Sequence, residues 1–547
     1  MYNYNNSCIN MAPPANEPIY TYEVASTERR LLKKTISDIK KEQIEIPIII
    51  NGKEIKTGKT SEITLPHNKK TVIGKYHQAS EKELNEAINA SLEASKEWSK
   101  FRWEERAAIF MKAAELLSTK YRHIVNAATM LSISKNVYQS EIDAVCELVD
   151  FFRFNVYFMQ KIYNEQPAFS TKGTYNFSEY RPMEGFIFAA TPFNFVSISG
   201  NLPTAPVIMG NVSVWKPAST SVLAPYYIMK ILKEAGLPDG VINFVPCPGS
   251  KVGKVCLNNP SLAGIHFTGS TEVFKSMWQQ VGNNIFDYKT YPRLVGETGG
   301  KDFVFVHNSA DIQQLVTALI RGAFEYQGQK CSAVSRAYIP KSIWKKVKDS
   351  LLSKTSKIKI GDIENFSNFM NAVIDKTSFD NIKSYIDYAR GSSEANIIIG
   401  GNCDDSVGYF IDPTIIETNN PTFKTMVEEI FGPVLTIFVY DDSKYEETLA
   451  LCDKTSVYGL TGAIFANDRK AISIATKKLR YAAGNFYIND KPTGAIVGQQ
   501  PFGGARDSGT NDKAGSLLNL TRWVSTRSIK ESYNAPSDFS YPFMLEK

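Results

Sequence analysis

Apolar and polar positions divide the chain into a helical first part and two later parts in which strands and helices alternate. Between residues 28 and 162, apolar residues recur at the spacing of one helix face. This pattern predicts helices over 28–43, 83–100, 104–120 and 140–162, the last of them largely apolar. Residues 1–20 are rich in Asn and Pro, which is typical of an extended arm.

From residue 185 onward, short apolar runs alternate with helical patterns. The runs predict strands over 185–190, 212–217, 241–246, 262–270 and 293–300, and helices are expected over 221–238, 250–258 and 271–281. This alternation indicates a doubly wound parallel sheet, which binds nucleotides at the carboxyl ends of its strands. A similar pattern over residues 301 to about 489 predicts a second α/β domain. The crevice between the two domains is the expected site.

Composition narrows the class of protein. The chain has 547 residues, 43% hydrophobic and 22% charged, which is ordinary for a globular protein of two or more domains. Its net charge of +6 is dispersed, so nothing favours nucleic acid binding. The seven cysteines and five histidines show no metal-binding spacing, so we expect no metal site and a reducing compartment. No run approaches the roughly 18 apolar residues of a membrane span.

Several side chains in these patterns are candidates for chemistry. Cys331 lies in EYQGQKCSAVSR, although a lone cysteine is more often a core residue. Glu297 ends an apolar strand and precedes two glycines, so it is a candidate base, or alternatively a turn cap. Asn194 follows another strand and is a candidate oxyanion donor, or a turn residue. Lys216 at a strand end and the Gly269-Ser270 turn are weak signals for phosphate or ribose binding.

The order of the motifs is more specific than any one of them. TPFNF, WKP, FTGS, GETGGK, GQKCS and EEIFGPV occur in the order that is found in the aldehyde dehydrogenase superfamily, and 34 residues separate Glu297 from Cys331. The chain is therefore identified as a member of that superfamily. Longer stretches, among them GNLPTAPVIMGNV and GNFYINDKPTGAIVGQQPFGGARDSGTNDK, closely resemble the members that oxidise L-glutamate γ-semialdehyde. This resemblance covers the chain from Ala15 to the C-terminus.

The resemblance implies the roles of the site residues. Cys331 is the expected nucleophile, Asn194 and the Cys331 backbone N–H hold the oxyanion, and Glu297 activates the water that hydrolyses the thioester. NAD is the expected cofactor. Its expected contacts are Thr191, Lys216, Gly269, Ser270, Thr271, Glu272, Val273, Glu429 and Phe431. Glu428 is a weaker candidate than Glu429. Thr298 differs from the Leu or Cys that many relatives carry beside the catalytic acid.

For the substrate, the resemblance implies one set of contacts for each end of an amino acid. Glu147 is expected near the ammonium group. Backbone N–H groups of Gly494 and Ala495, helped by Ser332, are expected at the carboxylate. Phe195 and Phe502 are expected to flank the aliphatic chain, although without the resemblance both would be interpreted as core aromatics.

The resemblance also implies the architecture: a Rossmann-type NAD-binding domain, an α/β catalytic domain and a β oligomerisation flap. We expect an N-terminal arm over 1–45, the NAD-binding domain over 46–300 with a flap segment at about 168–184, the catalytic domain over 301–495, and a C-terminal oligomerisation segment over 496–547. Two-stranded flaps are not stable alone, so a homodimer or larger assembly is expected.

The sequence leaves the cellular compartment and several rival functions open. Relatives of this kind work in the mitochondrial matrix, in the second step of proline degradation, but the first arginine is Arg29 and the N-terminus is a weak transit peptide, so the cytoplasm is the alternative. The N-terminus also lacks the apolar segment of a secretory signal. Another semialdehyde dehydrogenase, a cofactor-free cysteine hydrolase that uses a histidine base and a non-catalytic scaffold are the rival functions.

Overall fold

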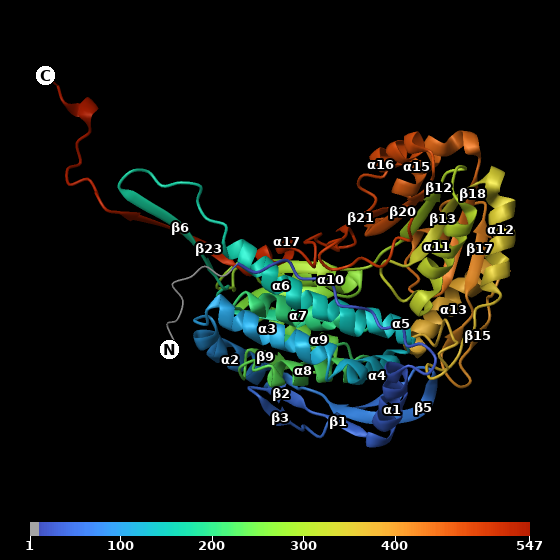
Figure 1. The fold of residues 1–547 in the computed structure, drawn as a ribbon, viewed down its shortest axis with the longest axis horizontal. Coiled ribbons are helices and arrows are strands. Elements are labelled where there is room, and N and C mark those ends of the chain that lie inside the picture. Colours follow the sequence, from blue (N-terminus) through green and yellow to red (C-terminus); the bar gives the residue numbers. More distant parts are fainter. Residues whose placement is uncertain (1–9, 547) are drawn as a thin grey trace.

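The computed structural model describes residues 10–546 and consists of two α/β bodies and a projecting two-stranded arm (Figure 1). The first body is built on a seven-stranded sheet. Five of its strands are parallel, and β2 and β3 add an antiparallel edge. In spatial order the strands are β11 (Arg293–Glu297), β10 (Leu262–Thr268), β7 (Phe186–Ala190), β8 (Ser213–Lys216), β9 (Ile242–Phe244), β2 (Ile48–Ile50) and β3 (Lys53–Ile55).

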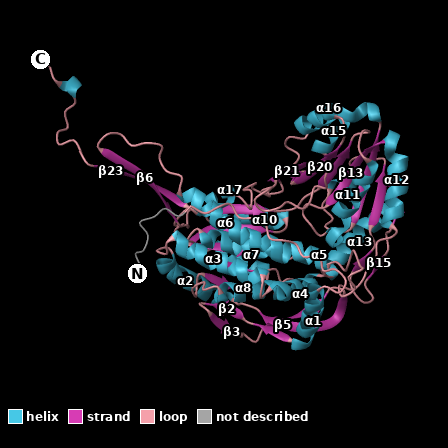
Figure 2. Cartoon of the chain, in the orientation of Figure 1, coloured by secondary structure: helices cyan, strands magenta, loops and turns pink. Residues whose placement is uncertain are grey.

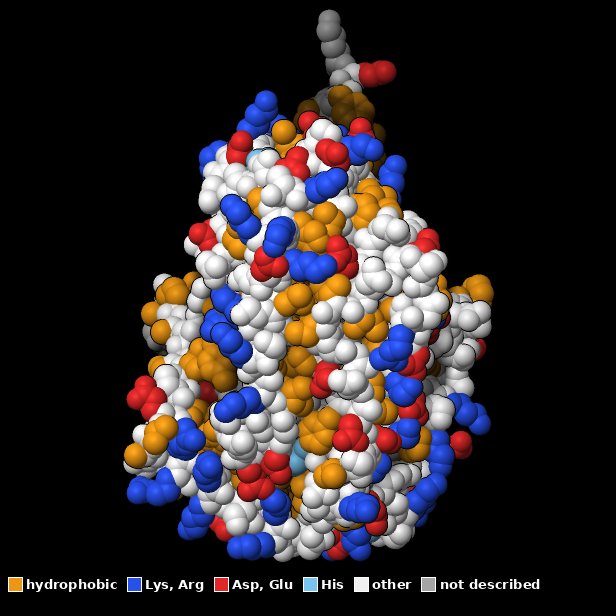
Figure 3. Space-filling model, turned by 90° about the vertical axis from the view of Figure 1, so that its right-hand side faces the viewer, with side chains coloured by type: hydrophobic (Ala, Val, Ile, Leu, Met, Phe, Trp, Pro, Cys, Tyr) orange, Lys and Arg blue, Asp and Glu red, His pale blue; other side chains and the backbone are white. Residues whose placement is uncertain are grey.

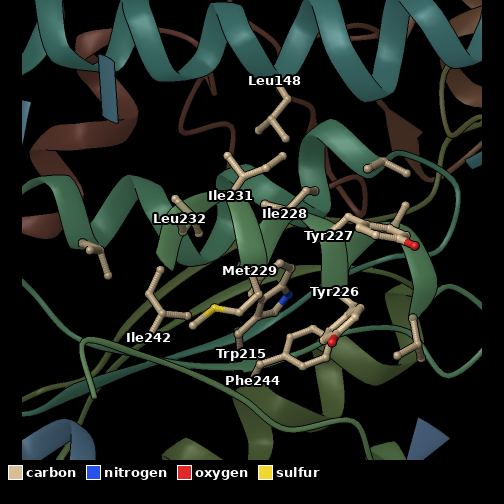
Figure 4. Packing of buried hydrophobic residues seen from close by; sticks show 14 of the residues in the cluster. Leu148, Trp215, Tyr226, Tyr227, Ile228, Met229, Ile231, Leu232, Ile242 and Phe244 are labelled. Carbon is tan, nitrogen blue, oxygen red and sulfur yellow. The ribbon is translucent and has the colours of Figure 1, made fainter. Parts of the chain in front are cut away.

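The helices of the first body pack against this sheet and against each other. Trp215 of β8 and Phe244 of β9 meet edge to face at 5.1 Å, and Met229 of α8 lies beside them (Figure 4). On the other side of α8, Ile231 points toward Leu148 of α6 (Figure 4). The helices concerned are α2 (Glu81–Trp98), α3 (Trp103–Ser118), α4 (Arg122–Ile133), α6 (Leu148–Tyr163), α7 (Val196–Ile208), α8 (Leu223–Glu234), α9 (Gly249–Leu257) and α10 (Thr271–Asn283).

The second body has a seven-stranded sheet of its own. Its strands are parallel except at the β14 edge. In spatial order they are β14 (Ala395–Ile399), β17 (Thr414–Thr418), β18 (Val434–Tyr440), β13 (Val334–Pro340), β12 (Asp302–Val306), β20 (Thr461–Phe465) and β21 (Asn485–Ile488). Its main helices are α11 (Ile312–Phe324), α12 (Lys341–Thr355), α13 (Lys376–Arg390), α15 (Tyr445–Lys454) and α16 (Arg469–Lys478). Strand β11 of the first sheet ends at Glu297, and strand β12 of the second begins at Asp302.

The predicted strands and helices are present, and two departures from the sequence prediction lie close to the site. The helix expected over 140–162 is a continuous succession of α5 (Val137–Ser140), a π-helix (Glu141–Glu147) and α6. Such widened turns are rare and often mark functional sites. The second difference is α7, which the sequence pattern did not predict because Pro203 and Pro206 lie inside it.

The N-terminal part lies against the first body. Residues 10–24 run without regular structure along α6 toward α1 (Thr27–Glu42), as the blue end of the chain shows in Figure 1. Helix α1 forms as predicted and buries Leu32, Ile36 and Ile39. Strands β1 (Ile44–Ile46), β5 (Asn68–His77) and β4 (Thr60–Leu65) form a small sheet beside it. Cys8 and the rest of residues 1–9 lie outside the described residues.

The expected flap strands pair with each other. β6 (Thr174–Arg181) and β23 (Ser525–Ser532) form an antiparallel ribbon in which Ser525 lies opposite Arg181 and Ser532 opposite Thr174. The ribbon projects from the first body (Figures 1 and 2). On the molecular face shown in Figure 3, basic and acidic side chains are interspersed with apolar ones. None of the helices in residues 10–546 combines the length and the apolar character needed to cross a bilayer.

Candidate active site

A cavity of ≈ 920 Å³ opens at the carboxyl ends of the parallel strands of the first sheet and extends to the second body. Thr191 follows β7, Lys216 ends β8 and Gly269 follows β10, so three neighbouring strands each deliver a residue to the cavity wall. From the second body come Cys331, Glu429 and Phe431. Asn194, Ser270 and Val273 complete the set of predicted residues that line it.

Cys331 lies in the turn before β13 and is buried. The preceding backbone turns sharply: Tyr326, Gln327 and Gly328 all have left-handed φ angles, of 51°, 57° and 67°. Gly328 is required there, because a Cβ would lie 2.2 Å from the carbonyl oxygen of Gly432. Burial, helped by nearby carboxylates that include Asp302, raises the pKa of the Cys331 thiol well above its usual value. The resting side chain is therefore a protonated thiol.

Asn194 lies beside the segment that carries Cys331. The Asn194 side-chain Nδ2 donates a hydrogen bond to the carbonyl oxygen of Gln329 at 3.1 Å. This bond fixes the amide of a loop residue from the first body against the second body. Because an amide nitrogen carries two hydrogens, one remains for a substrate oxygen.

Glu297 ends β11 and is enclosed by the returning chain. Its Oε2 accepts a hydrogen bond from the backbone N–H of Gly504 at 3.0 Å. Burial raises the pKa of the Glu297 carboxyl well above its usual value, although the Gly504 hydrogen bond and the charge of Lys513 act in the opposite direction. The carboxyl is also close enough to Cys331 to contribute to the raised pKa of the thiol. The two candidate catalytic groups are thus brought together.

The predicted phosphate region is the N-terminus of α10. Ser270 caps this helix by accepting a hydrogen bond from the N–H of Val273. Thr271, in the first turn, accepts one from the N–H of Gly299 at 3.4 Å, whereas Glu272 is exposed and lines no part of the cavity. Lys216 faces the same cavity, and none of the carboxylates in residues 10–546 forms an ion pair with it. Burial lowers the pKa of Lys216.

Glu429 and Glu428 point in different directions. The Oε1 atom of Glu429 accepts a hydrogen bond from the N–H of Gly300 at 2.8 Å, and burial raises the pKa of this carboxyl to about 7. Glu428 is exposed and accepts a hydrogen bond from the hydroxyl of Tyr385 at 2.7 Å. Of the two, only Glu429 lines the cavity. Phe431 also lines the cavity, and its ring contacts the Phe193 ring edge to face, with 5.9 Å between the ring centres.

The residues predicted for the substrate lie outside the lining of this cavity. Phe195 and Ser332 directly follow Asn194 and Cys331 in the chain, so they lie next to the candidate catalytic groups. The Ser332 hydroxyl is 2.8 Å from the hydroxyl of Thr493, immediately before Gly494 and Ala495. Phe502 is fixed by backbone hydrogen bonds with Ala514, in both directions.

Glu147 ends the π-helix and directly precedes α6, and its side chain lies beside the start of α7. Its Oε2 accepts a hydrogen bond from the Ser197 hydroxyl at 2.8 Å. Burial, followed by the negative charge of Asp143, raises the pKa of Glu147 to about 8. A substrate cation beside this carboxyl would favour its charged form.

A buried group that the sequence did not reveal supports this region. Lys135 is fully buried and forms an ion pair of 2.6 Å with Asp143. Asp143 also accepts hydrogen bonds from the backbone N–H groups of Val196 and Ser197 and from the Ser197 hydroxyl, at 2.7–3.0 Å. The Lys135 ammonium lies 4.2 Å from the Phe195 ring centre. This cluster fixes the start of α7, next to Asn194.

Within residues 10–546, the structure contains no cluster of side chains that is suited to binding a metal ion. No group of three or more His, Cys, Asp or Glu side chains is placed there to hold a metal ion. All five histidines are described, and none of them lines the cavity at Cys331.

The comparisons with known proteins agree with this geometry. The profile described as "Aldehyde dehydrogenase family" matches residues 54–529. The chain therefore belongs to the aldehyde dehydrogenase family, as the order of the motifs predicted. It is 53% identical over 541 residues to the mitochondrial delta-1-pyrroline-5-carboxylate dehydrogenase of Dictyostelium discoideum, covering 98% of this chain and 97% of the relative. It is 49% identical over 531 residues to the human protein of the same name, covering 97% and 94%.

Solved structures confirm the predicted α/β fold. The delta-pyrroline-5-carboxylate dehydrogenase of Mycobacterium tuberculosis bound with NAD superposes with a TM-score of 0.96 at 49% identity, covering 99% of this chain and 100% of that one. The 1-pyrroline-5-carboxylate dehydrogenase of Thermus with bound NAD gives a TM-score of 0.90 at 30% identity, covering 96% and 100%.

Proposed function

We propose that this chain is an NAD-dependent dehydrogenase that oxidises L-glutamate γ-semialdehyde, in equilibrium with delta-1-pyrroline-5-carboxylate, to L-glutamate. One observation carries the proposal: Cys331 and Asn194 line the large cavity, the Glu297 carboxyl acts on the Cys331 thiol, and the next residues in the chain lead to the contacts of Ser332 with Thr493 and of Ser197 with Glu147. A cofactor and an amino-acid aldehyde can then reach the same thiol from two sides. The similarity to delta-1-pyrroline-5-carboxylate dehydrogenases over nearly the whole chain supports this substrate.

The chemistry of the cavity fits NAD. A helix N-terminus that opens on the cavity at Gly269 and Ser270 offers N–H donors to a pyrophosphate. Lys216 supplies a half-buried cation that forms no ion pair within residues 10–546, and Glu429 supplies a carboxylate that can accept hydrogen bonds from ribose hydroxyls. Thr191, the first turn of α10 (Thr271–Val273) and Phe431 complete the proposed set. When bound, NAD accepts the hydride that the aldehyde carbon gives up.

The thiol begins the reaction. The Cys331 sulfur adds to the aldehyde carbon as its proton passes to water in the cavity, and the carbonyl oxygen becomes an oxyanion. The free hydrogen of the Asn194 amide and the backbone N–H of Cys331 are the proposed donors to that oxyanion. Loss of hydride from the same carbon leaves a thioester on Cys331.

Glu297 completes the turnover. A water molecule attacks the thioester carbon while one of its protons passes to the Glu297 carboxylate. The carbon–sulfur bond then breaks, glutamate is released, and the Cys331 thiolate takes the proton back from Glu297. A carboxyl group in an apolar enclosure is a stronger base than one in water, which suits this step. The Gly504 hydrogen bond directs one oxygen and leaves Oε1 for the water.

The substrate contacts select an amino acid. We assign the ammonium group to Glu147, the carboxylate to the N–H groups of Gly494 and Ala495 with Ser332, and the aliphatic chain to Phe195 and Phe502. A semialdehyde without an amino group leaves the half-buried Glu147 without a cationic partner, which disfavours that substrate. A cysteine hydrolase is disfavoured because none of the histidines lines the cavity at Cys331.

We also propose where the protein works and how it assembles. The β6–β23 ribbon is a projecting two-stranded element that gains stability from a partner, so we propose self-association as a homodimer or larger assembly. The relatives from Dictyostelium discoideum and Homo sapiens are named as mitochondrial, which supports the mitochondrial matrix as the proposed compartment.

Absorbance of NADH during incubation with NAD and L-glutamate γ-semialdehyde tests the function. Wild type should turn over and Cys331→Ala should be inactive while keeping its melting temperature. Succinic semialdehyde, tested in parallel, should give a kcat/KM at least about tenfold lower because it leaves Glu147 unpaired. A folded wild-type protein that produces no NADH from glutamate semialdehyde, or that prefers succinic semialdehyde, would overturn the proposed substrate.

A further inference from the structure

Asn16, in the N-terminal segment, joins two distant parts of the substrate region. Its Nδ2 donates hydrogen bonds to Oδ2 of Asp150 at 2.8 Å and to the carbonyl oxygen of Val497 at 2.9 Å. Its Oδ1 accepts a hydrogen bond from Nε2 of Gln499 at 2.9 Å. Both amide hydrogens and the amide oxygen are thus committed to these two segments.

Each of the two segments carries one half of the proposed amino-acid site. Asp150 is in the first turn of α6, three residues after Glu147, the proposed partner of the ammonium group. Val497 and Gln499 belong to the loop that contains Gly494 and Ala495, the proposed carboxylate donors. Asn16 therefore links the two segments that are proposed to bind the ammonium and the carboxylate groups of the substrate.

The loop also rests directly on α6. Val497 is buried in a small apolar cluster with Phe151 and Phe154. Gly498 has a φ of 81°, and a Cβ there would lie 2.2 Å from Cε1 of Phe154. This close packing sets how near the loop lies to the helix, and the Asn16 hydrogen bonds set its position along the helix.

The segment that presents Asn16 is itself held firmly. The N–H of Glu17 donates to Oδ1 of Asp150 at 2.7 Å. The Glu17 carboxylate forms ion pairs with Arg122 at 2.6 Å and Arg153 at 2.8 Å. Farther along, the N–H of Tyr20 donates to Glu141 of the π-helix at 3.0 Å. Asn16 therefore connects the loop to a rigid base.

We propose that Asn16 is a positioning residue that determines specificity for amino-acid aldehydes. It holds the carboxylate-binding loop in register with the helix that carries Glu147, so that both ends of the substrate are bound at once. This inference rests on the proposed function. Loss of the Asn16 amide frees the loop, and displacements of about 1 Å in such contacts cost on the order of a hundredfold.

The test compares Asn16→Ala with Thr21→Ala in the full-length chain. Thr21 lies in the same segment, is exposed, and its hydroxyl contacts only Glu23 among the described side chains. For Asn16→Ala we expect KM for L-glutamate γ-semialdehyde to rise at least about tenfold. The kcat and the KM for NAD should stay within about twofold, because the cavity is formed by other elements. Thr21→Ala should match wild type.

Gln499→Ala gives a second route to the same result if Asn16→Ala folds poorly. Gln499 is exposed and donates to Asn16, so its loss should raise the same KM, and adding it to Asn16→Ala should have little further effect. Hydrogen exchange of the 494–499 amides should accelerate in both variants. A fall in kcat accompanied by equal rises in both KM values, or unchanged hydrogen exchange in the loop, would overturn the inference.

The same assay separates the two proposals. Turnover of glutamate semialdehyde by wild type with unchanged kinetics in Asn16→Ala refutes the role of Asn16 alone. Absence of wild-type turnover refutes the proposed function, and loop exchange then decides by itself whether Asn16 holds the loop.

Discussion

The carboxylate of Glu297 accepts its hydrogen bond from the backbone of Gly504, a residue 207 positions later in the chain. One carboxylate oxygen is thereby fixed by the C-terminal segment that closes over the strand, and the other remains available. A neutral side chain of the same shape would keep this hydrogen bond and lose only the ability to accept a proton.

Glu297→Gln should bind aldehyde and NAD but fail to hydrolyse the thioester. Because general-base catalysis contributes about 10²–10⁴-fold, the steady-state rate should fall by that factor. A rapid burst of NADH, equal to the concentration of active sites, should precede the slow phase. Stopped-flow absorbance measures both. A variant with a slow rate and no burst would assign Glu297 to an earlier step.

Gly299→Ala should weaken NAD binding without touching the thiol. A Cβ at Gly299 would lie 2.4 Å from Oε2 of Glu429, so the carboxylate must move away from its proposed contact with the ribose. We expect KM for NAD to rise about tenfold, the loss of roughly one charge-assisted hydrogen bond. Gly282→Ala is the matched control, because a Cβ there meets nothing within 4 Å. Equal effects in both variants would argue against the Glu429 contact.

Glu147→Gln should change the dependence of stability on pH. Burial raises the pKa of Glu147 to about 8 from an ordinary value of 4.5, so between these pH values the folded state binds more protons than the unfolded state. The contribution of Glu147 to stability is therefore fully present below about pH 4.5 and is lost as the pH rises through 8. Gln has no such loss.

Melting temperatures measured by calorimetry at pH 5 and pH 8 check this expectation. The melting temperature of the variant should rise relative to that of wild type as the pH increases. Its KM for the amino-acid aldehyde should also increase, because the ammonium group of the substrate loses its charged partner. A gap between variant and wild type that is constant with pH would show that Glu147 has an ordinary pKa.

The Lys135–Asp143 pair should respond unequally to removal of its two members. Asp143→Ala leaves a fully buried ammonium group without a partner and should cost about 3–5 kcal/mol of folding free energy. Lys135→Met should cost less, because Asp143 keeps the donors of Val196 and Ser197. The double variant should be more stable than Asp143→Ala. Thermal unfolding of the three variants measures the order, and equal losses for both single variants would contradict it.

Removal of β23 should abolish the proposed self-association. Deletion of residues 525–547 leaves β6 without its partner strand, whereas deletion of 533–547 keeps the whole ribbon. Sedimentation velocity should show a smaller species for the first deletion and the wild-type assembly for the second. An unchanged assembly in both would place the contact between subunits elsewhere.

The sequence predicted the elements that deliver the site better than the contacts that shape it. Thr191, Lys216 and Gly269 follow neighbouring apolar strands, and parallel strands bring their carboxyl ends to one edge, so these residues meet as expected. The choice of Glu429 over Glu428 was made from the motif; in the structure Glu429 lines the cavity, whereas Glu428 is exposed. By contrast, α7 was missed because two prolines obscure its helical pattern.

The sequence by itself determined the family and the alternating α/β pattern, and it named the candidate reacting groups, because strands, helices and short motifs depend on residues that are close along the chain. Only the tertiary structure decided how those groups are supported. Asn16 and Val497 are 481 positions apart, and Lys135 gives no local sign that Asp143 will neutralise it. Buried polar groups must find partners wherever the fold places them, and no periodicity along the chain encodes that choice.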